Sequence, residues 1–315
     1  GGSVNADPLL TPSAPSPSPS ASPAGPMAPL TGLPASSAAA AARPAVAVVV
    51  AGTKPQGLNA ADVVWEEVTS PVRYIAVFQS QQASAVGPVT TTQPTDRMAL
   101  AVLHPVVAYH GAAAKYFIKL LDASSVLDMG QATDAGLYKG SAGAYTVSTR
   151  AFNRPAAKAK ATAPTALFPY WTAGSQTLGV RESRPASVKV HIPGAGTQVW
   201  TFDGHADRWS LTRGGPAVQV ANLVIQTVSY KQIKVGPKTG LSVPSAQVLG
   251  TGQTQVFSGG AGGGTTGTAV GGIWSKQKLG DVTSYFDTGG NPMVFEPGPT
   301  WIILAPDGTQ VTTST

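Results

Sequence analysis

The 315-residue sequence contains no cysteine, few charged residues and no long apolar run. Without cysteine, the chain can form no disulfide bond, thiol nucleophile or cysteine-ligated zinc site. Charged residues make up only 11% of the chain, and 15 of them are acidic, so few groups are available for acid–base chemistry. No apolar stretch reaches the roughly 18 residues that indicate a membrane-spanning helix.

Lysine and arginine outnumber the acidic residues and give the chain a formal net charge of +6. A basic chain suits an anionic partner such as an acidic wall polymer, a lipid headgroup or nucleic acid. The cations are scattered, however, with no run of three, whereas nucleic-acid-binding proteins gather them in a patch or stripe. We therefore expect no nucleic-acid partner.

Residues 1–42 differ in composition from the rest of the chain. The stretch TPSAPSPSPSASPAGP at 11–26 has no charge and no aromatic side chain, so it buries too little apolar surface to offset its chain entropy. We expect 1–42 to be a disordered Pro/Ser/Ala-rich tether, with a plain disordered tail as the alternative. The chain opens with GGSVNADP rather than methionine, which is typical of a mature or trimmed sequence.

Residues 43–170 alternate between strand and helix patterns, which predicts an α/β layer. The run PAVAVVVAG at 44–52 is rich in valine, as in a strand buried on both faces. An amphipathic pattern predicts a helix over 112–123, and a second helix over 96–103 has Thr95 or Asp96 as its expected cap. The other expected elements are strands at 62–68, 72–80 and 105–110 and a surface helix within 150–163.

The pattern changes after a connector at 171–186. From 187 to 315, short alternating runs are separated by Gly, Asp, Asn and Pro turns, which predicts an antiparallel β-rich domain, either a barrel or a sandwich. The expected fold class is therefore α+β, with an N-terminal α/β layered domain followed by this β-rich domain. Four tryptophans of the second domain are expected in its core, a glycan-stacking strip being the alternative: Trp200, Trp209, Trp274 and Trp301.

Residues 262–267 read GGGTTG, which satisfies the dinucleotide-binding pattern G-x-G-x-x-G. Such a site needs a helix directly after the glycines, so that the helix N–H groups meet the pyrophosphate. Here Gly271 and Gly272 break any helix, and a strand pattern begins at Ile273. We therefore expect a loop between two strands and no bound nucleotide.

Two short motifs match those of penicillin-binding enzymes: S-x-x-K at 275–278 and K-T-G at 238–240. In an acyl-enzyme the serine begins a helix, so that its lysine lies one turn away. Ser275 lies in a strand pattern instead, where positions three apart point to opposite faces. The order of the motifs along the chain is also inverted. We interpret both matches as coincidence.

The four histidines form no metal-binding pattern, since no H-E-x-x-H occurs. His110 is the one of interest, because it ends a strand pattern directly before Gly111, where α/β sheets tend to place ligand-contacting residues. A purely structural histidine is the other interpretation. No metal ion and no cofactor are expected.

Glu66 and Glu67 are adjacent, so on a strand they point to opposite faces and cannot form a catalytic carboxylate pair. Arg73 lies at the start of the next expected strand. Across a short hairpin, Glu66 and Arg73 are expected to form a buried or half-buried ion pair, either structural or part of a functional site.

Several stretches taken together resemble the YerB-like family of bacterial envelope lipoproteins, whose function is unknown. This resemblance implies a two-part layout, export, and a lipidated cysteine just before a flexible tether; the present chain holds no cysteine. It implies no reaction and no catalytic residue. The stretches are PLTGLP (29–34), RPAVAVVVAG (43–52), QGLNAADVVWEE (56–67), VRYIAVFQSQQASAVGPV (72–89), GGIWSK (271–276), YFDTGG (285–290) and GNPMVFEPGPTWIILAP (290–306).

The sequence departs from the family pattern where members carry VGPVRSAR. Here the stretch reads VGPVTTTQP, with uncharged side chains in place of arginine. This loss favours a binding or scaffolding role over chemistry. The uncharged residues are Thr90, Thr91, Thr92 and Gln93.

The sequence thus favours an exported, lipid-anchored envelope protein that binds or scaffolds a partner protein or wall polymer without catalysis. Its contact residues would be Glu66, Arg73, His110 and the loop 90–93, in a groove between the domains or at an exposed sheet edge. The alternative is a cell-wall hydrolase that uses Glu66 as acid or base with His110 nearby. A structural spacer is a third interpretation.

Overall fold

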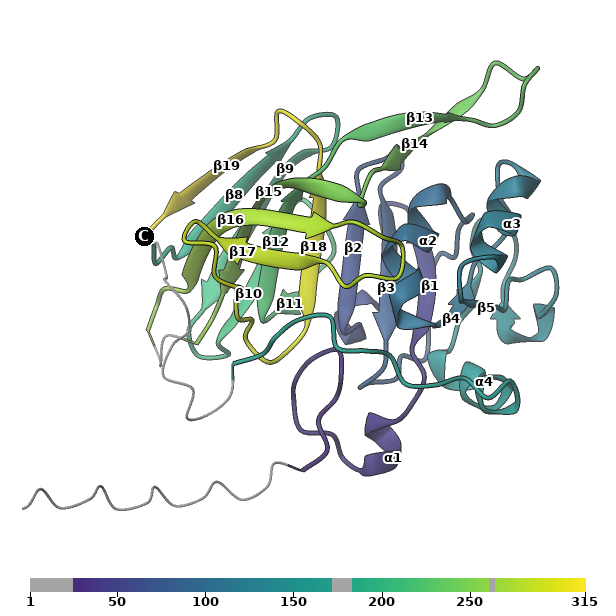
Figure 1. Ribbon diagram of the computed structural model, residues 1–315, viewed down its shortest axis with the longest axis horizontal. Coiled ribbons are helices and arrows are strands. Elements are labelled where there is room, and N and C mark those ends of the chain that lie inside the picture. The colour runs from purple at the N-terminus through teal and green to yellow at the C-terminus, as the bar shows by residue number, and fades with distance from the viewer. Residues whose placement is uncertain (1–24, 172–182, 261–263) are drawn as a thin grey trace, which may run out of the picture.

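Two β-sheets packed face to face form most of the protein, with helices on the outer face of the larger sheet (Figure 1). The computed structural model describes residues 25–171, 183–260 and 264–315. The expected connector at 171–186 falls largely outside the described residues. The chain is mostly β, so the α+β description holds only loosely.

The N-terminal half forms the strands and helices that its patterns predict. The run at 44–52 becomes a strand in which five of six residues are buried, as expected of a strand covered on both faces. In chain order the elements are α1 (Ala38–Ala41), β1 (Val46–Ala51), β2 (Val63–Glu67), β3 (Arg73–Phe78), α2 (Pro94–Leu100), β4 (Val106–Ala108), α3 (Lys115–Asp122), β5 (Leu127–Asp128), β6 (Tyr138–Lys139), β7 (Thr146–Val147) and α4 (Asn153–Lys158), with 3₁₀ turns at Leu58–Ala60, Ala101–Leu103, Ala135–Leu137 and Thr149–Phe152.

Helix α2 begins earlier than predicted, and neither Thr95 nor Asp96 is its cap. Gln93 is the N-cap and Pro94 the first helical residue, a position that suits proline because its missing N–H is not needed there. Asp96 sits one turn inside, and its carboxylate accepts the Gln93 backbone N–H at 2.9 Å. Among the described residues, no helix is long and apolar enough to cross a membrane.

The C-terminal half contains only strands in its described part. They are β8 (Ser187–Ile192), β9 (Gly196–Asp203), β10 (Arg208–Arg213), β11 (Gln219–Val220), β12 (Asn222–Thr227), β13 (Tyr230–Lys234), β14 (Ser242–Ala246), β15 (Gly250–Ser258), β16 (Thr268–Lys276), β17 (Ser284–Asp287), β18 (Thr300–Ala305) and β19 (Gln310–Ser314).

Strands from both halves share the larger sheet, whose order is β17-β16-β15-β12-β18-β2-β3-β1-β4-β5. The C-terminal half is therefore not wholly antiparallel as expected, because β18 lies parallel to both β2 and β12. The smaller sheet, β11-β10-β9-β8-β19, is antiparallel as predicted. Pairing of β18 with β2 joins residues more than 200 positions apart, so the two sequence-predicted units do not form separate sheets.

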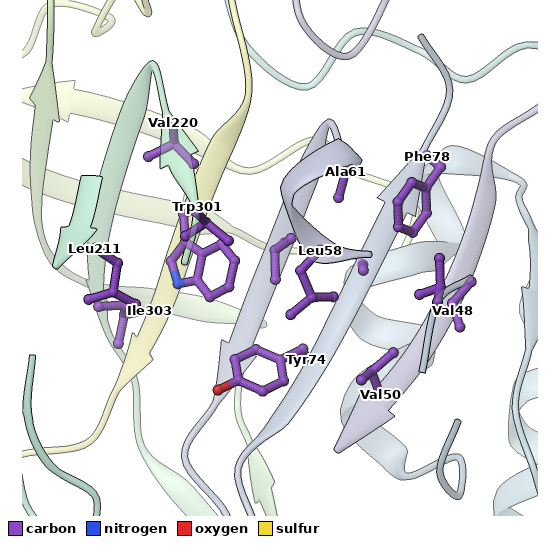
Figure 2. Packing of buried hydrophobic residues seen from close by; sticks show 14 of the residues in the cluster. Val48, Val50, Leu58, Ala61, Tyr74, Phe78, Leu211, Val220, Trp301 and Ile303 are labelled. Carbon is purple, nitrogen blue, oxygen red and sulfur yellow. The ribbon is translucent and has the colours of Figure 1, made fainter. Parts of the chain in front are cut away.

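Two apolar layers hold the structure together, one on each face of the larger sheet. The first lies between the two sheets; Figure 2 shows part of it, with Trp301 and Ile303 of β18 and Leu211 of β10. The second lies beneath α2, with Leu100 and Phe168 packed on the other face. Alternate residues of each strand enter alternate layers, as the pleat requires. The four tryptophans are buried, which confirms their predicted place in the core.

Residues 25–42 are structured, so the prediction of a disordered tether as far as residue 42 is wrong for this part; residues 1–24 lie outside the described residues. Leu30 is fully buried, and Ser37 caps α1 by accepting the Ala40 N–H at 3.0 Å. The buried Gln79 amide donates to the carbonyls of Ala40, Ala41 and Arg43 at 3.0–3.1 Å. Burial of Leu30 and these hydrogen bonds offset the conformational entropy that residues 25–42 lose when they become ordered.

Candidate binding site

Arg73 lies in a buried cluster of charges at the carboxyl end of β2. Its Nη2 donates to both carboxylate oxygens of Asp96, at 2.9 and 3.0 Å, and to the carbonyl of Thr91 at 2.9 Å. Its Nη1 lies 3.4 Å from Glu67 Oε1. Burial by itself would lower the pKa of Arg73, but the charges of Asp96 and Glu67 outweigh it and raise that pKa. The guanidinium therefore joins β3, α2 and the 90–93 loop.

The expected pairing of Glu66 with Arg73 is wrong by one residue. In the β2–β3 ladder Arg73 lies opposite Glu67, and Glu66 lies opposite Tyr74. Because neighbouring strand residues point to opposite faces, Glu67 faces Arg73 while Glu66 faces the smaller sheet. Burial raises the pKa of Glu67 to about 7, although the Arg73 charge acts in the opposite direction.

Glu66 is only 3% exposed and lies between the two sheets. Its carboxylate accepts hydrogen bonds from Gln198 Nε2 at 2.6 Å and from Trp301 Nε1 at 2.9 Å. Gln198 is fixed in turn, because its Oε1 accepts from Trp200 Nε1 at 2.9 Å. Burial raises the pKa of Glu66 to about 7, and the two donated hydrogen bonds oppose that rise. This chain of contacts links β2, β18 and β9.

The 90–93 loop is held to the end of β4 rather than left free. The His110 backbone N–H donates to the Thr90 carbonyl at 2.8 Å, and Thr92 N–H donates to the Gly111 carbonyl at 3.0 Å. Thr92 Oγ1 also donates to Asp96 at 2.9 Å. The His110 ring stands edge-on to Tyr145, with 5.0 Å between ring centres.

The sequence-predicted site residues therefore separate into two places. Arg73, Thr90–Gln93 and His110 come together at the carboxyl ends of β1 and β4, while Glu66 faces a different layer. Glu66 is almost wholly buried and accepts hydrogen bonds from Gln198 and Trp301, whereas the His110 ring contacts Tyr145, so the geometry does not support a hydrolase built on Glu66 and His110.

The two motif matches lie outside the structural context of an enzyme, and a strand follows the glycine-rich stretch as predicted. Ser275 lies on β16 and Lys278 follows the end of that strand, while residues 238–240 lie in the turn between β13 and β14, so neither motif has its enzymatic context. A strand, not a helix, begins at Thr268 directly after GGGTTG. Residues 262 and 263 of GGGTTG lie outside the described residues.

The structure does form an open groove, on the face of β12, β15, β16 and β17 that looks toward β19. We call this the sheet groove. It has a volume of about 730 Å³ and adjoins a second hollow of about 620 Å³ with which it shares Thr227, Gln253 and Thr309. The remaining residues of the sheet groove are Ile225, Thr254, Gln255, Gly271, Gly272, Ile273, Phe286, Asp287, Thr288, Gly290 and Val311.

Strand register places the floor residues of the sheet groove in two rows. Gln253 lies opposite Ile273, which lies opposite Phe286 on the next strand. In the second row Gln255 lies opposite Gly271. Glycine has no side chain, so the groove is deeper beside Gln255 than beside Ile273. Gln253 and Gln255 are exposed, and Ile273 is 48% exposed. The floor thus presents two amides beside an apolar and aromatic strip.

The sheet groove is almost free of charge. Asp287, one of its walls, is buried, and Oδ1 of its carboxylate accepts the backbone N–H groups of Gly289 and Asn291, each at 2.9 Å. No lysine, arginine or histidine is among the described residues that line it. The available groups are therefore amides, hydroxyls and apolar surface, which fit a neutral ligand with many hydrogen-bonding groups.

Sequence reasoning missed the sheet groove, although one signal was present. In GQTQVF (252–257) the polar residues Gln253 and Gln255 alternate with Thr254 and Val256, so they share one face of a strand. Nothing in the sequence shows whether another sheet covers that face.

The comparisons with known proteins agree with the architecture. Two family models match: the N-terminal domain of a protein of unknown function (DUF3048), over residues 30–167, and the C-terminal domain of the same family, over 188–302. The crystal structure of YerB protein from Bacillus subtilis is similar with a TM-score of 0.69, at 21% identity over 91% of this chain and 99% of that one. No curated protein matches.

The identity to YerB is low enough that this likeness establishes the fold alone, whereas the two family models together cover most of the chain. The chain therefore belongs to the DUF3048 family of proteins of unknown function and is YerB-like.

Proposed function

We propose that this protein is a non-enzymatic binding protein of the bacterial cell envelope, and that its sheet groove holds a neutral polysaccharide of the wall. The observation that carries the proposal is the uncharged row of Gln253, Ile273 and Phe286 across three strands. Side-chain amides exchange hydrogen bonds with sugar hydroxyls, and an apolar or aromatic surface covers the C–H face of a sugar ring.

The shape of the sheet groove favours a polymer over a small metabolite. Small-molecule sites are enclosed and bury most of their ligand, whereas this groove lies open on a sheet face. It also runs on into the second hollow past Thr227 and Thr309. A chain molecule can occupy both hollows at once.

Several observations support a role without catalysis. Glu66 and Glu67, whose pKa values are raised by burial, lie in buried contacts that join elements. Neither lines the sheet groove. The described residues also contain no group of three or more acids or histidines placed to hold a metal ion. The envelope location is carried by the YerB-like resemblance and by the Pro/Ser-rich stretch before residue 27.

The test is calorimetric titration of the full chain with soluble, neutral, linear oligosaccharides, both β-1,4-glucose and β-1,4-N-acetylglucosamine oligomers. The double variant Gln253→Ala with Gln255→Ala should weaken binding by about tenfold or more, since each lost hydrogen bond contributes on the order of 1 kcal/mol. Gln219→Ala with Gln277→Ala, which removes two exposed glutamines elsewhere, should bind like the original chain.

Equal binding by both double variants would remove the sheet groove from the proposal. Absence of binding to every neutral sugar, together with sedimentation of the protein with whole wall fragments, would leave an envelope-binding protein whose ligand is not a neutral glycan.

A further inference from the structure

A two-stranded hairpin, β13 with β14, projects from the body of the protein (Figure 1). It starts beside the carboxyl ends of β2 and β18. We call residues 230–246 the β-arm. Its base is held firmly: the Tyr230 hydroxyl accepts the Val68 N–H at 2.8 Å and donates to the Leu304 carbonyl at 2.6 Å. On the other strand, the Ser245 hydroxyl lies 3.1 Å from that of Thr95. The β-arm is therefore a fixed projection.

The β-arm is basic along its length. Lys231, Lys234 and Lys238 are exposed, and the arm contains no acidic residue. Because the whole chain has a net charge of +6, these three cations amount to half of that excess in one short segment. A projecting group of cations without nearby acids on the same element creates a local positive potential that attracts an anionic surface.

The end of the β-arm also exposes an apolar side chain. Leu241 is 63% exposed, the largest value among the large hydrophobic residues in the described parts of the chain. The turn that holds it is ordered: Val235 N–H donates to the Leu241 carbonyl at 2.9 Å, and Leu241 N–H donates to Thr239 Oγ1 at 3.2 Å. The ordered turn therefore holds Leu241 where most of its side chain is exposed to solvent.

Helix α3 adds an amphipathic residue beside the arm. The Tyr116 hydroxyl donates to the Lys234 carbonyl at 2.5 Å, and its ring is 39% exposed. Lys115 and Lys119 of the same helix are also exposed. Tyrosine is enriched at the membrane–water interface, where its ring lies at headgroup level, and lysines near an anionic bilayer are attracted to it.

We propose that the β-arm rests on an anionic lipid bilayer. In this arrangement the lysines lie among the headgroup phosphates, Leu241 enters the boundary with the acyl chains, and Tyr116 lies at headgroup level. Phosphate groups explain the cations, but only an apolar boundary explains why an ordered turn holds a leucine in solvent. An acidic wall polymer would bind the lysines and leave Leu241 exposed.

The test is co-sedimentation of the full chain with vesicles of phosphatidylglycerol and phosphatidylcholine, compared with vesicles of phosphatidylcholine alone. Each lysine near an anionic bilayer contributes a factor of about five in partitioning. The variant Lys231→Gln, Lys234→Gln, Lys238→Gln should therefore bind anionic vesicles about 100-fold more weakly. A control with the same loss of charge replaces three exposed lysines elsewhere: Lys139→Gln, Lys158→Gln, Lys189→Gln.

Substitution of Leu241 provides a second, independent measurement. Leu241→Ser should weaken binding to anionic vesicles and leave binding to soluble polyphosphate unchanged, and a Leu241→Trp reporter should shift its fluorescence to the blue only with anionic vesicles. If the control triple variant loses as much vesicle binding as the arm variant, the β-arm is not the contact. If Leu241→Ser has no effect on vesicles, the arm binds polyanions and the membrane proposal fails.

Discussion

Two regions of the ten-stranded sheet, one around β2 and β3 and the other around β15 and β16, use polar side chains in opposite ways. Around β2 and β3 the polar groups are charged and buried, and they join separate elements, as Arg73 joins β3 to α2 through Asp96. On the face of β15 that forms the sheet groove, the polar groups Gln253 and Gln255 are neutral and exposed, and they face open space. The charged groups hold the fold, and the neutral groups remain available to a ligand.

This difference shows why a charged residue is a poor guide to function in this protein. Moving a charge out of water is costly unless a partner compensates for it. A charged side chain buried in the sheet is therefore held in place by its partners and is not free to contact a ligand. Neutral amides can stand exposed on a sheet at little cost. If the division holds, substitutions around β2 and β3 should alter stability, and substitutions in the sheet groove should alter binding.

The largest expected effect is at Asp96. Asp96→Ala leaves the Arg73 guanidinium buried without its main partner, and breaking a buried ion pair in this way costs about 3–5 kcal/mol of unfolding free energy. Urea denaturation of the variant measures this loss, with the exposed Asp281→Ala as control. A loss below about 1 kcal/mol would contradict a structural role for the cluster.

The next effect is a pH dependence caused by Glu66. Its pKa rises from 4.5 to about 7 on folding, so the folded chain binds that proton more tightly. The corresponding stability, about 3 kcal/mol, is fully present below pH 4.5 and is lost as pH rises through 7. Glu67 and Asp62 shift in the same direction, so denaturation curves of the original chain and Glu66→Gln must be compared. Their difference should change by that amount across this window; parallel curves would refute the prediction.

A smaller effect is expected at Gly272, in the strand that forms the groove floor. A Cβ there would lie 1.8 Å from the Phe286 carbonyl oxygen, so Gly272→Ala must push β17 away from β16. We expect a loss of about 1–3 kcal/mol, as for other overpacked sites, and weaker sugar binding. Gly280→Ala, where nothing lies within 4 Å, is the matched control in thermal and chemical denaturation. Equal stability of the two variants would show that β17 yields freely.

The smallest effect is expected at His110. Its ring contacts Tyr145 edge-on, and phenylalanine preserves that contact. His110→Phe should change the unfolding free energy by less than about 1 kcal/mol and should leave sugar binding unchanged in calorimetry. Loss of binding without loss of stability would return His110 to the functional site.

Part of this picture could be predicted from the sequence. The valine-rich run at 44–52 predicted a strand buried on both faces, and the placing of Glu66 and Glu67 on opposite faces was correct. The choice of Glu66 as the partner of Arg73 was wrong, because a hairpin can close in registers that differ by one residue and each register exchanges the two faces. The sheet groove escaped prediction because alternation shows which residues share a face and not whether another sheet covers it.

The sequence by itself determined where strands form, which tryptophans are buried and that a strand follows the glycine-rich stretch, because propensity and alternation act over a few neighbouring residues. Only the tertiary structure decided that β18 pairs with β2, that Glu66 meets Trp301 and Gln198, and that one sheet face stays open beside β19. Those outcomes depend on contacts between residues far apart in the chain, and such contacts are set by the packing of whole layers.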